Sequence, residues 1–352
     1  MKNILVTGGA GFIGSNFIRY ILNKNEEVRV INVDKLTYAG NLENLKGLEG
    51  NPRYIFEKID ICNKQAVKRV MEDYNVDTII NFAAESHVDR SIVDPTEFIN
   101  TNIKGTQILL DIAKKIWTIG EDKYKEGTRY VQVSTDEVYG SLEQDEKCFT
   151  EKTPLNPHSP YSASKASADM LVKAYYDTYK FPACITRCSN NYGPYQFPEK
   201  FIPLIINNCL KHKLIPIYGD GSNIRDWLYV EDHCEAIYKV ALKGKIGDIY
   251  NIGGHNERTN IQIVKKIINY MHDNVDDSIN EKLITYVKDR KGHDKRYGIN
   301  PEKIFKELDW IPKTQFEDGI VQTIKWYLKN QEWLENVVSG EYEKYYNRMY
   351  KI

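Results

Sequence analysis

The sequence predicts an α/β protein with a doubly wound parallel sheet and a smaller C-terminal substrate-binding lobe. Three observations favour this fold class. Short apolar segments alternate with segments of helical periodicity in the first half of the chain. A glycine-rich turn joins the first apolar segment to the first helical segment, and an acidic residue ends the second apolar segment. Such alternation is typical of parallel strands whose helices cover both faces of the sheet.

Apolar and β-branched runs mark the expected strands, and apolar residues at helical spacing mark the expected helices. We expect strands at residues 3–7, 28–33, 54–56, 78–82 and 130–133, and helices at 12–22, 64–74 and 96–117. After about residue 185, segments rich in Gly, Pro, Asn and Asp predict long loops at 190–203 and 218–226. Short helices are expected at 202–210, 230–242, 261–271 and 316–330, and residues 246–252 are expected to rejoin the main sheet.

The composition of the 352-residue chain is typical of a globular protein, with 41% hydrophobic and 28% charged residues. The 48 Lys and Arg residues balance 49 Asp and Glu residues, which argues against a dedicated nucleic-acid or membrane-surface binder. No apolar run approaches the roughly 18–20 residues of a membrane helix, and the first expected strand begins too near Met1 for a secretory leader. Six scattered cysteines without a CxxC pair favour reduced thiols over zinc or disulfides, and therefore a cytosolic protein.

The turn after the first expected strand has the spacing of a dinucleotide-binding motif. Gly9, Gly11 and Gly14 fit G-x-G-x-x-G, while Gly8, Gly11 and Gly14 fit G-x-x-G-x-x-G. Glycines permit the tight turn and the close approach of the backbone to a pyrophosphate. The N-terminus of the following helix then offers free N–H groups and a positive dipole to the phosphates.

An acidic residue at the end of the second expected strand completes this motif. Asp34 lies 20 residues after Gly14 (34 − 14), the usual offset for a carboxylate that binds ribose hydroxyls. A carboxylate there repels a 2′-phosphate, so NAD is favoured over NADP. The sequence therefore predicts a Rossmann-type NAD-binding domain over residues 1–188, rejoined by about 228–256, and a discontinuous substrate-binding lobe over 189–352.

A second group of residues is suited to redox and acid–base chemistry. Tyr161 and Lys165 form a Y-x3-K motif at the start of an expected helix, where positions i and i+4 share a face. We expect the Lys165 ammonium to stabilise the phenolate and to lower the pKa of Tyr161 from its usual value of about 10. Thr135, Asp136 and Glu137 follow an expected strand, at the edge where open α/β sheets bind ligands.

The two adjacent carboxylates suggest an acid and a base. Consecutive residues on a regular strand point to opposite faces, so Asp136 and Glu137 can reach one cleft only from a loop beyond the strand. Crowding two carboxyl groups into a low-dielectric site raises the pKa of one of them. A protonated acid and an ionised base can then coexist.

These residues resemble the extended short-chain dehydrogenase/reductase superfamily and, within it, the family of dTDP-glucose 4,6-dehydratases over nearly the whole chain. The stretches that carry the resemblance are 7–14, 34–42, 83–89, 134–140, 159–165, 189–194 and 225–227. The first and fifth stretches are superfamily-wide, whereas the adjacent Asp136 and Glu137 distinguish the dehydratases.

The resemblance implies a hydro-lyase with tightly bound NAD that converts dTDP-glucose to dTDP-4-keto-6-deoxyglucose, a step of deoxysugar biosynthesis such as that of rhamnose. Tyr161, assisted by Thr135 and Lys165, would remove the proton of the C4 hydroxyl while NAD takes the C4 hydride. Glu137 would remove the C5 proton, and Asp136 would protonate the departing C6 hydroxyl. The hydride would return to C6, without net oxidation of the cofactor.

The resemblance also assigns binding residues. Those expected along NAD are Gly8, Gly11, Phe12, Ile13, Gly14, Asp34, Lys35, Leu36, Thr37, Asp60, Ile61, Ala83, Ala84, Ser86, Thr101, Tyr161 and Lys165. Those expected on the nucleotide sugar are His87, Thr135, Asn190, Lys200, Arg225, Asn260, His293 and Tyr297. The Arg225 guanidinium is suited to a bidentate grip on pyrophosphate. Two of these residues also have a plain structural interpretation, Asp60 as a solvated loop acid and His87 as a buried structural histidine.

Two residues depart from the family pattern in the stretch 289–297, which leaves the selectivity for the nucleotide base open. Lys291 stands where the family usually has Pro, and the loss of that ring frees the backbone φ angle. Lys295 stands where Arg is common, which weakens any bidentate contact.

Alternative functions and assemblies stay open at this point. Another nucleotide-sugar 4,6-dehydratase or a 4-epimerase, acting on a UDP-, GDP- or CDP-sugar, would use the same redox pair, and a non-catalytic NAD-binding sensor would share the fold. An epimerase has no need of an adjacent acid–base pair, so Asp136 and Glu137 favour a dehydratase. The expected helix at 96–117 is apolar beyond one face. That pattern fits either the homodimer typical of the family or a buried helix in a monomer.

Overall fold

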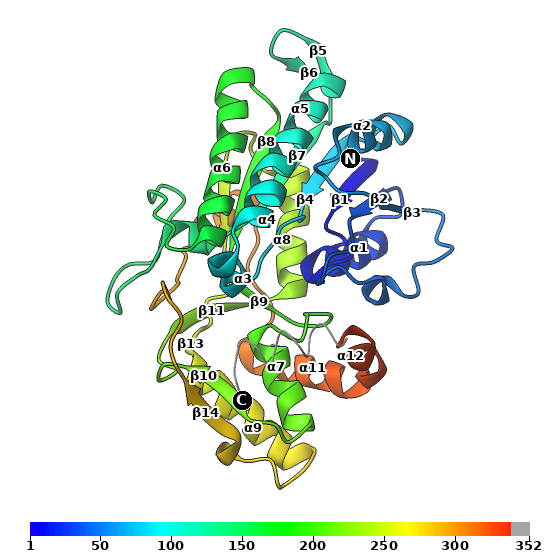
Figure 1. The fold of residues 1–352 in the computed structure, drawn as a ribbon. Helices are drawn as coiled ribbons and strands as arrows, with labels where there is room; N and C mark the ends of the chain where they lie inside the picture. Colours follow the sequence, from blue (N-terminus) through cyan, green and yellow to red (C-terminus); the bar gives the residue numbers. More distant parts are fainter. Residues whose placement is uncertain (339–352) are drawn as a thin grey trace.

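A computed structural model describes residues 1–338 of the chain and has a central parallel sheet as its main layer (Figure 1). Seven strands form this sheet in the order β12-β8-β7-β4-β1-β2-β3, and every neighbouring pair is parallel. The strands are β1 (Asn3–Thr7), β2 (Arg29–Asp34), β3 (Tyr54–Lys58), β4 (Thr78–Asn81), β7 (Arg129–Thr135), β8 (Ala183–Cys188) and β12 (Ile249–Ile252). This arrangement confirms the predicted doubly wound α/β fold class.

Helices cover both faces of the sheet because its side chains alternate between two apolar clusters. Ile4 and Val6 of β1 belong to one cluster, with helices on that face, and Leu5 between them belongs to the other. The first face carries α1 (Phe12–Lys24), α8 (Val230–Lys243) and α10 (Glu302–Leu308). The second face carries α2 (Lys64–Asp73), α5 (Thr106–Trp117) and α6 (Pro160–Tyr179). The order of the sheet reverses at β1, which pairs with β2 on one side and with β4 on the other.

A second, smaller group of elements lies beside the carboxyl edge of the sheet and has its own apolar core (Figure 1). Its strands form two small sheets, β13-β11-β9 and β10-β14. The strands are β9 (Asn190–Tyr192), β10 (Ile215–Tyr218), β11 (Ile224–Tyr229), β13 (Glu257–Thr259) and β14 (Ile284–Val287). The helices are α7 (Phe201–Leu210), α9 (Asn260–Asn274), α11 (Phe316–Lys329) and α12 (Gln331–Val337). We call this group the second lobe.

Two features of the second half of the chain differ from expectation. β8 was not expected as a strand, because its run of apolar residues is broken by Thr186 and Arg187. The structure buries Arg187 by pairing its Nε atom with Asp169 Oδ2 at 2.9 Å. The expected loops at 190–203 and 218–226 are partly wrong as well, because they contain β9, the start of α7 and the start of β11.

The expected helix at 96–117 is continuous but not uniform. A π-helical segment, Ile99–Gly105, separates the short α4 (Thr96–Phe98) from α5. A Cβ on Gly105 would lie 2.5 Å from the Ile61 side chain, so this turn packs closely against the chain that follows β3. Within the same segment, Asn102 Nδ2 donates to the Glu85 carbonyl at 3.0 Å and to Ser164 Oγ at 2.8 Å. Such widened turns are frequent at functional sites.

The remaining elements are peripheral. A short α3 (Val88–Val93) precedes α4, and β5 (Thr118–Gly120) and β6 (Lys123–Tyr124) form an exposed hairpin.

Residues 246–252 contribute β12 to the main sheet, as predicted. Within the described residues 1–338, no helix is both long and apolar enough to cross a bilayer. All six cysteines are free thiols.

Candidate active site

A cavity lies along the carboxyl edge of the sheet, where parallel strands of open α/β folds bind their ligands. Residues that follow β1, β2, β3, β4, β7 and β8 all line it. The second lobe contributes Gln196, Phe197 and Lys200 to the opposite wall. The cavity therefore lies between the sheet and the second lobe, and it spans the point at which the strand order reverses.

The turn after β1 has room for a backbone but not for side chains. A Cβ on Gly14 would lie 2.4 Å from the Gly8 carbonyl oxygen, and one on Gly8 would lie 2.7 Å from Ala83 N. Gly8 also has a φ of +69°, which favours glycine. Helix α1 follows Gly11, which makes no side-chain cap, so the first-turn amides meet no side-chain acceptor. This geometry fits a pyrophosphate.

Asp34 at the end of β2 is held rigidly beside this turn. Its Oδ2 atom accepts a hydrogen bond from Ala10 N at 3.0 Å, and its Oδ1 atom accepts one from Leu36 N at 2.8 Å. Burial raises the pKa of the Asp34 carboxyl, and the two backbone amides and Lys35 oppose that shift. A fixed carboxylate at this position fits the ribose hydroxyls of NAD, so the residues present are suited to that cofactor.

Most residues expected along the cofactor line this cavity. They are Gly8, Gly11, Phe12, Ile13, Gly14, Asp34, Lys35, Thr37, Ile61, Ala83, Ala84, Ser86, Thr101, Tyr161 and Lys165. Leu36 and Asp60 lie outside this lining. The Asp60 side chain is 43% exposed, its Oδ1 atom accepts from Cys62 N at 2.8 Å, and its Oδ2 atom lies 3.8 Å from Lys35 Nζ. These contacts match the structural interpretation of Asp60 as a solvated loop acid, and they do not place its side chain in the wall of the cavity.

The adjacent carboxylates lie beyond β7, as expected, but only one of them faces the cavity. Thr135 ends the strand and caps a 3₁₀ turn, Asp136–Tyr139, by accepting a hydrogen bond from Glu137 N at 3.3 Å. Glu137 lines the cavity together with Thr135. Asp136 is outside the lining and 1% exposed, and its Oδ2 atom has no hydrogen-bond partner among residues 1–338. The expectation that both carboxylates reach one cleft is therefore met by Glu137 alone.

The surroundings of the two carboxyl groups favour different protonation states. Burial raises the pKa of Asp136 well above its usual value, and the charges of Glu137 and Asp226 raise it further. Burial also raises the pKa of Glu137; Arg225 opposes the shift at both carboxyl groups, and Arg290 opposes it at Glu137. Asp136 is thus suited to be a proton donor, and Glu137 is the better base.

Tyr161 and Lys165 lie at the start of α6, but they do not interact as the sequence predicted. The helix begins with a capping box between Ser159 and Ser162. Lys165 Nζ donates to the Val133 carbonyl at 2.7 Å, and burial lowers the pKa of Lys165. Burial and the charge of Glu137 raise the pKa of Tyr161 well above its usual value, although the Thr135 hydroxyl opposes this shift. The pKa of Tyr161 is therefore raised and not lowered as expected, because burial is the largest influence on it.

Of the residues expected on the nucleotide sugar, Thr135, Asn190 and Lys200 line the cavity. Lys200 Nζ donates to the Ser86 carbonyl at 3.0 Å, across the gap between the two lobes. His87 is 8% exposed, and burial together with Lys200 lowers its pKa well below the usual value, so its imidazole is neutral. This environment matches the interpretation of His87 as a buried structural histidine.

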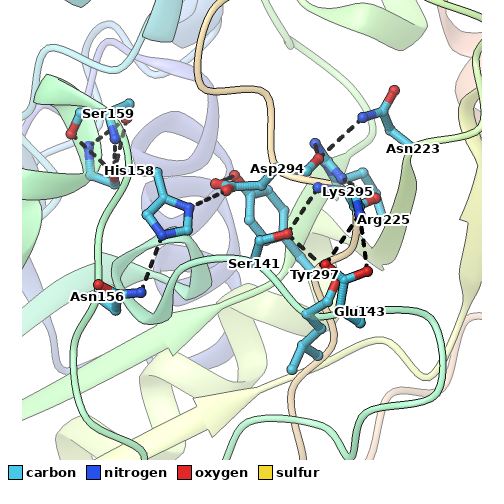
Figure 2. A network of polar contacts seen from close by, with 12 residues as sticks. Ser141, Glu143, Asn156, His158, Ser159, Asn223, Arg225, Asp294, Lys295 and Tyr297 are labelled. Atoms are coloured by element: carbon cyan, nitrogen blue, oxygen red, sulfur yellow. Dashed lines mark hydrogen bonds and ion pairs between the residues drawn. The ribbon is translucent and has the colours of Figure 1, made fainter.

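The other expected sugar residues lie in or beside the segment 289–297. Arg225 donates to the backbone carbonyls of Ile224, Asp294 and Lys295, and its Cζ atom lies 4.1 Å from the centre of the Tyr297 ring (Figure 2). These hydrogen bonds engage Nη1 and Nη2, three of the five N–H donors of the guanidinium, and the expected bidentate grip on pyrophosphate stays a prediction. His293 pairs with Asp289 at 2.6 Å, and burial lowers its pKa to about 4. Asn260 begins α9, and its backbone N donates to the Asn223 carbonyl at 3.0 Å.

Some residues of the site could not be identified by the sequence reasoning. Arg290 lowers the pKa of Glu137 and lies 3.7 Å from Asp89. Its position inside the stretch 289–297 is the signal that could have found it. Phe197 and Cys188 line the cavity, and neither has a sequence pattern that marks it.

Replacement of Gly14 by alanine is expected to disrupt the dinucleotide turn. The new Cβ would overlap the Gly8 carbonyl, so we expect NAD affinity to fall at least about tenfold, measured by calorimetry on apoenzyme. Gly120→Ala is the matched control, because a Cβ there meets only the Lys123 side chain at 3.8 Å in an exposed hairpin. Equal NAD affinities for the two variants would contradict this account of the turn.

Comparisons with known proteins agree with this geometry. A sequence model described as GDP-mannose 4,6 dehydratase matches residues 5–323. A dTDP-glucose 4,6-dehydratase from Escherichia coli is 53% identical over 352 residues, covering 96% of this chain and 97% of the relative. Among solved structures, a dTDP-glucose 4,6-dehydratase from Bacillus anthracis in complex with NAD has a TM-score of 0.86 at 50% identity, covering 96% of this chain and 100% of that one.

More distantly related structures share the fold at a lower percentage of identical residues. The UDP-glucose 4-epimerase of Thermotoga maritima, solved with UDP-glucose, has a TM-score of 0.82 at 27% identity, covering 94% of this chain and 99% of that one. The identity to the dehydratases is about twice as high and extends over nearly the full length of both chains. The chain therefore belongs to the dTDP-glucose 4,6-dehydratase family within the short-chain dehydrogenase/reductase superfamily.

Proposed function

We propose that this chain is an NAD-dependent dTDP-glucose 4,6-dehydratase, a hydro-lyase that forms dTDP-4-keto-6-deoxyglucose. The observation that carries the proposal is the position of Asp136 and Glu137 directly beyond β7, where Glu137 and Tyr161 line one cavity with the glycine turn. Membership of the dehydratase family and the fit of the turn to NAD support it. When bound, NAD accepts a hydride from the sugar and later returns it.

In the first stage, Tyr161 is the group suited to take the proton of the C4 hydroxyl. It lies at the first turn of α6 beside the Thr135 hydroxyl, and both line the cavity. In the protein alone, burial and Glu137 keep this phenol protonated. Lys165 lines the same cavity, and its ammonium, which donates one of its three N–H groups to the Val133 carbonyl, is suited to support the phenolate by its charge.

In the second stage, the ketone at C4 acidifies the proton at C5, and Glu137 is placed to remove it. Its carboxyl group faces the cavity, and Arg290 and Arg225 oppose the rise of its pKa that burial causes. Asp136, whose pKa burial raises well above the usual value, is the donor we assign to the departing C6 hydroxyl. Among residues 1–338 its Oδ2 atom has no hydrogen-bond partner, but the side chain lies outside the cavity lining, so this role requires it to turn toward the cavity when the sugar binds.

The acid–base pair also separates this proposal from the nearest alternative. A 4-epimerase returns the hydride to C4, so no C–O bond breaks and no acid is needed for a leaving hydroxyl. The buried, protonated Asp136 beside Glu137 has a use only in elimination. A sensor without catalysis has no use for either carboxyl or for Tyr161 in the cavity.

Incubation with a panel of nucleotide sugars tests the activity and its base selectivity together. We expect purified protein with NAD to convert dTDP-glucose to a product lighter by 18 mass units, the mass of water. UDP-glucose, GDP-mannose and CDP-glucose should react more slowly or not at all. Product masses from mass spectrometry decide the outcome, and an isomer of unchanged mass would instead identify an epimerase.

Amide variants of the two carboxylates are expected to separate oxidation from elimination. Asp136→Asn and Glu137→Gln should still reduce NAD transiently, since neither carboxyl takes the C4 proton, while water loss should fall about 100-fold or more. Tyr161→Phe should suppress both stages. Stopped-flow absorbance of NADH with product mass measures each stage, and equal loss of both stages in all three variants would contradict the division of roles.

We also propose that residues 1–188 with about 228–256 form the NAD-binding domain of a cytosolic homodimer, and that the rest forms the substrate-binding lobe. Support for the dimer comes from apolar side chains that are exposed on adjoining helices. Val93 of α3 is 71% exposed, Ile99 of the π-helical segment 52%, and Met170 of α6 65%. Buried dimer interfaces are rich in such groups. The free cysteines support the cytosolic location.

A charge placed on this surface is expected to break the dimer. Met170→Glu should convert a dimer to a monomer of 40.9 kDa in analytical ultracentrifugation, because a carboxylate buried in an apolar interface is costly. Ile311→Glu, at a side chain 56% exposed just after α10 on the opposite face of the sheet, is the control and should stay dimeric. A monomeric wild-type protein would contradict the dimer.

A further inference from the structure

One buried carboxylate outside the cavity lining connects several parts of the site. Asp294 is 6% exposed, and its Oδ1 atom lies 2.6 Å from His158 Nδ1 (Figure 2). Its Oδ2 atom accepts a hydrogen bond from the Tyr297 hydroxyl, also at 2.6 Å. Its backbone carbonyl accepts from Arg225 Nη2 at 2.9 Å and from Asn223 Nδ2 at 3.1 Å. Four side chains from three segments of the chain, at 158, 223–225 and 297, thus converge on one residue.

On the side of the second lobe, Asp294 holds Arg225 in place. The Arg225 side chain stacks on the ring of Tyr297, with 4.1 Å from Cζ to the ring centre, and Asp294 binds that ring's hydroxyl. The same residue's carbonyl binds the edge of the guanidinium. Asp294 therefore helps to hold both the face and the edge of Arg225, which is 5% exposed and also donates to the Ile224 and Lys295 carbonyls.

On the other side, Asp294 reaches the catalytic elements through His158. His158 directly precedes Ser159, the N-cap of α6, and Tyr161 follows in the first turn. Its Nε2 atom lies 3.1 Å from Asn156 Nδ2. Asn156 N in turn donates to the Val138 carbonyl at 3.0 Å, inside the 3₁₀ turn that carries the acid–base pair.

We propose that Asp294 is a positioning residue that, through His158, keeps the Arg225–Tyr297 side of the cleft in register with the turn and helix that carry Glu137 and Tyr161. This role rests on the proposed function. The dehydratase reaction presents one sugar to two proton acceptors, at its C4 hydroxyl and at C5. Small misplacements of a bound substrate relative to catalytic groups cost large factors in rate.

The charge of Asp294 also affects the base, which provides a readout that a purely structural residue would not change. Burial and Asp294 raise the pKa of Glu137, while Arg290, Arg225 and Lys200 lower it. The other titratable groups that interact with Glu137 are Asp136, Tyr161 and Tyr297. Removal of the Asp294 charge lowers the pKa of Glu137, so the ionised base persists to lower pH.

Two variants test the role in the NAD-loaded enzyme with dTDP-glucose. Asp294→Asn is expected to lower kcat about 10- to 100-fold and to move the acid limb of the kcat/KM profile to lower pH. His158→Asn leaves the Asp294 charge in place, so it should lower kcat without moving the acid limb of the kcat/KM profile to lower pH. Because the His158 side chain is 40% exposed, this second variant tests the link even if Asp294→Asn does not fold.

A second histidine–aspartate pair is the matched control. His212 Nε2 lies 3.3 Å from Asp276 Oδ2 on the surface of the second lobe, so His212→Asn should keep the wild-type kcat and pH profile. An active wild-type enzyme with unchanged kcat and pH profile in both test variants would overturn the positioning role alone. An inactive wild-type enzyme would overturn the proposed function, and the role with it.

Discussion

The common direction of the seven strands in the main sheet is the constraint on which the site depends. Parallel strands end at one edge, so the residues that follow β1, β2, β3, β4, β7 and β8 meet there. The residues after β1 and those after β8 are more than 150 residues apart in the chain. The reversal of strand order between β1 and β4 leaves a crevice at that edge. The close turn at Gly8 and Gly14 allows a cofactor to lie against backbone there.

Burial is the main cause of the chemistry assigned to the site. It is the largest influence on the pKa of Asp136, Glu137, Tyr161 and Lys165. Once water is excluded, nearby charges act strongly: Glu137 and Asp226 raise the pKa of Asp136 further, while Arg290 opposes the rise at Glu137. The same exclusion explains why Lys165 binds a backbone carbonyl in the protein alone, since a buried ammonium needs an acceptor.

The second lobe contributes charge and order to the site as well as part of its lining. Lys200 crosses to the Ser86 carbonyl, and Arg225 is held on Tyr297 by buried hydrogen bonds. By contrast, Lys295 extends outward to Glu143, with 72% of its side chain exposed. An exposed pair of this kind adds little to stability or position. The departure of Lys295 from the family pattern is therefore compatible with an intact core of the segment.

The sequence by itself determined the features that depend on residues close together in the chain. The alternation of strands and helices, the glycine turn, Asp34 at its offset and the loop position of Asp136 and Glu137 all follow from local spacing and turn chemistry. Tertiary structure decided what local spacing cannot encode. It paired the buried Arg187 of β8 with Asp169, widened the turn at Ile99–Gly105, and directed Lys165 Nζ to the Val133 carbonyl. It also brought Arg290 close enough to influence the pKa of Glu137 and bound the Arg225 guanidinium to backbone carbonyls. Side-chain direction and pKa depend on neighbours from distant segments, and only folding brings those neighbours together.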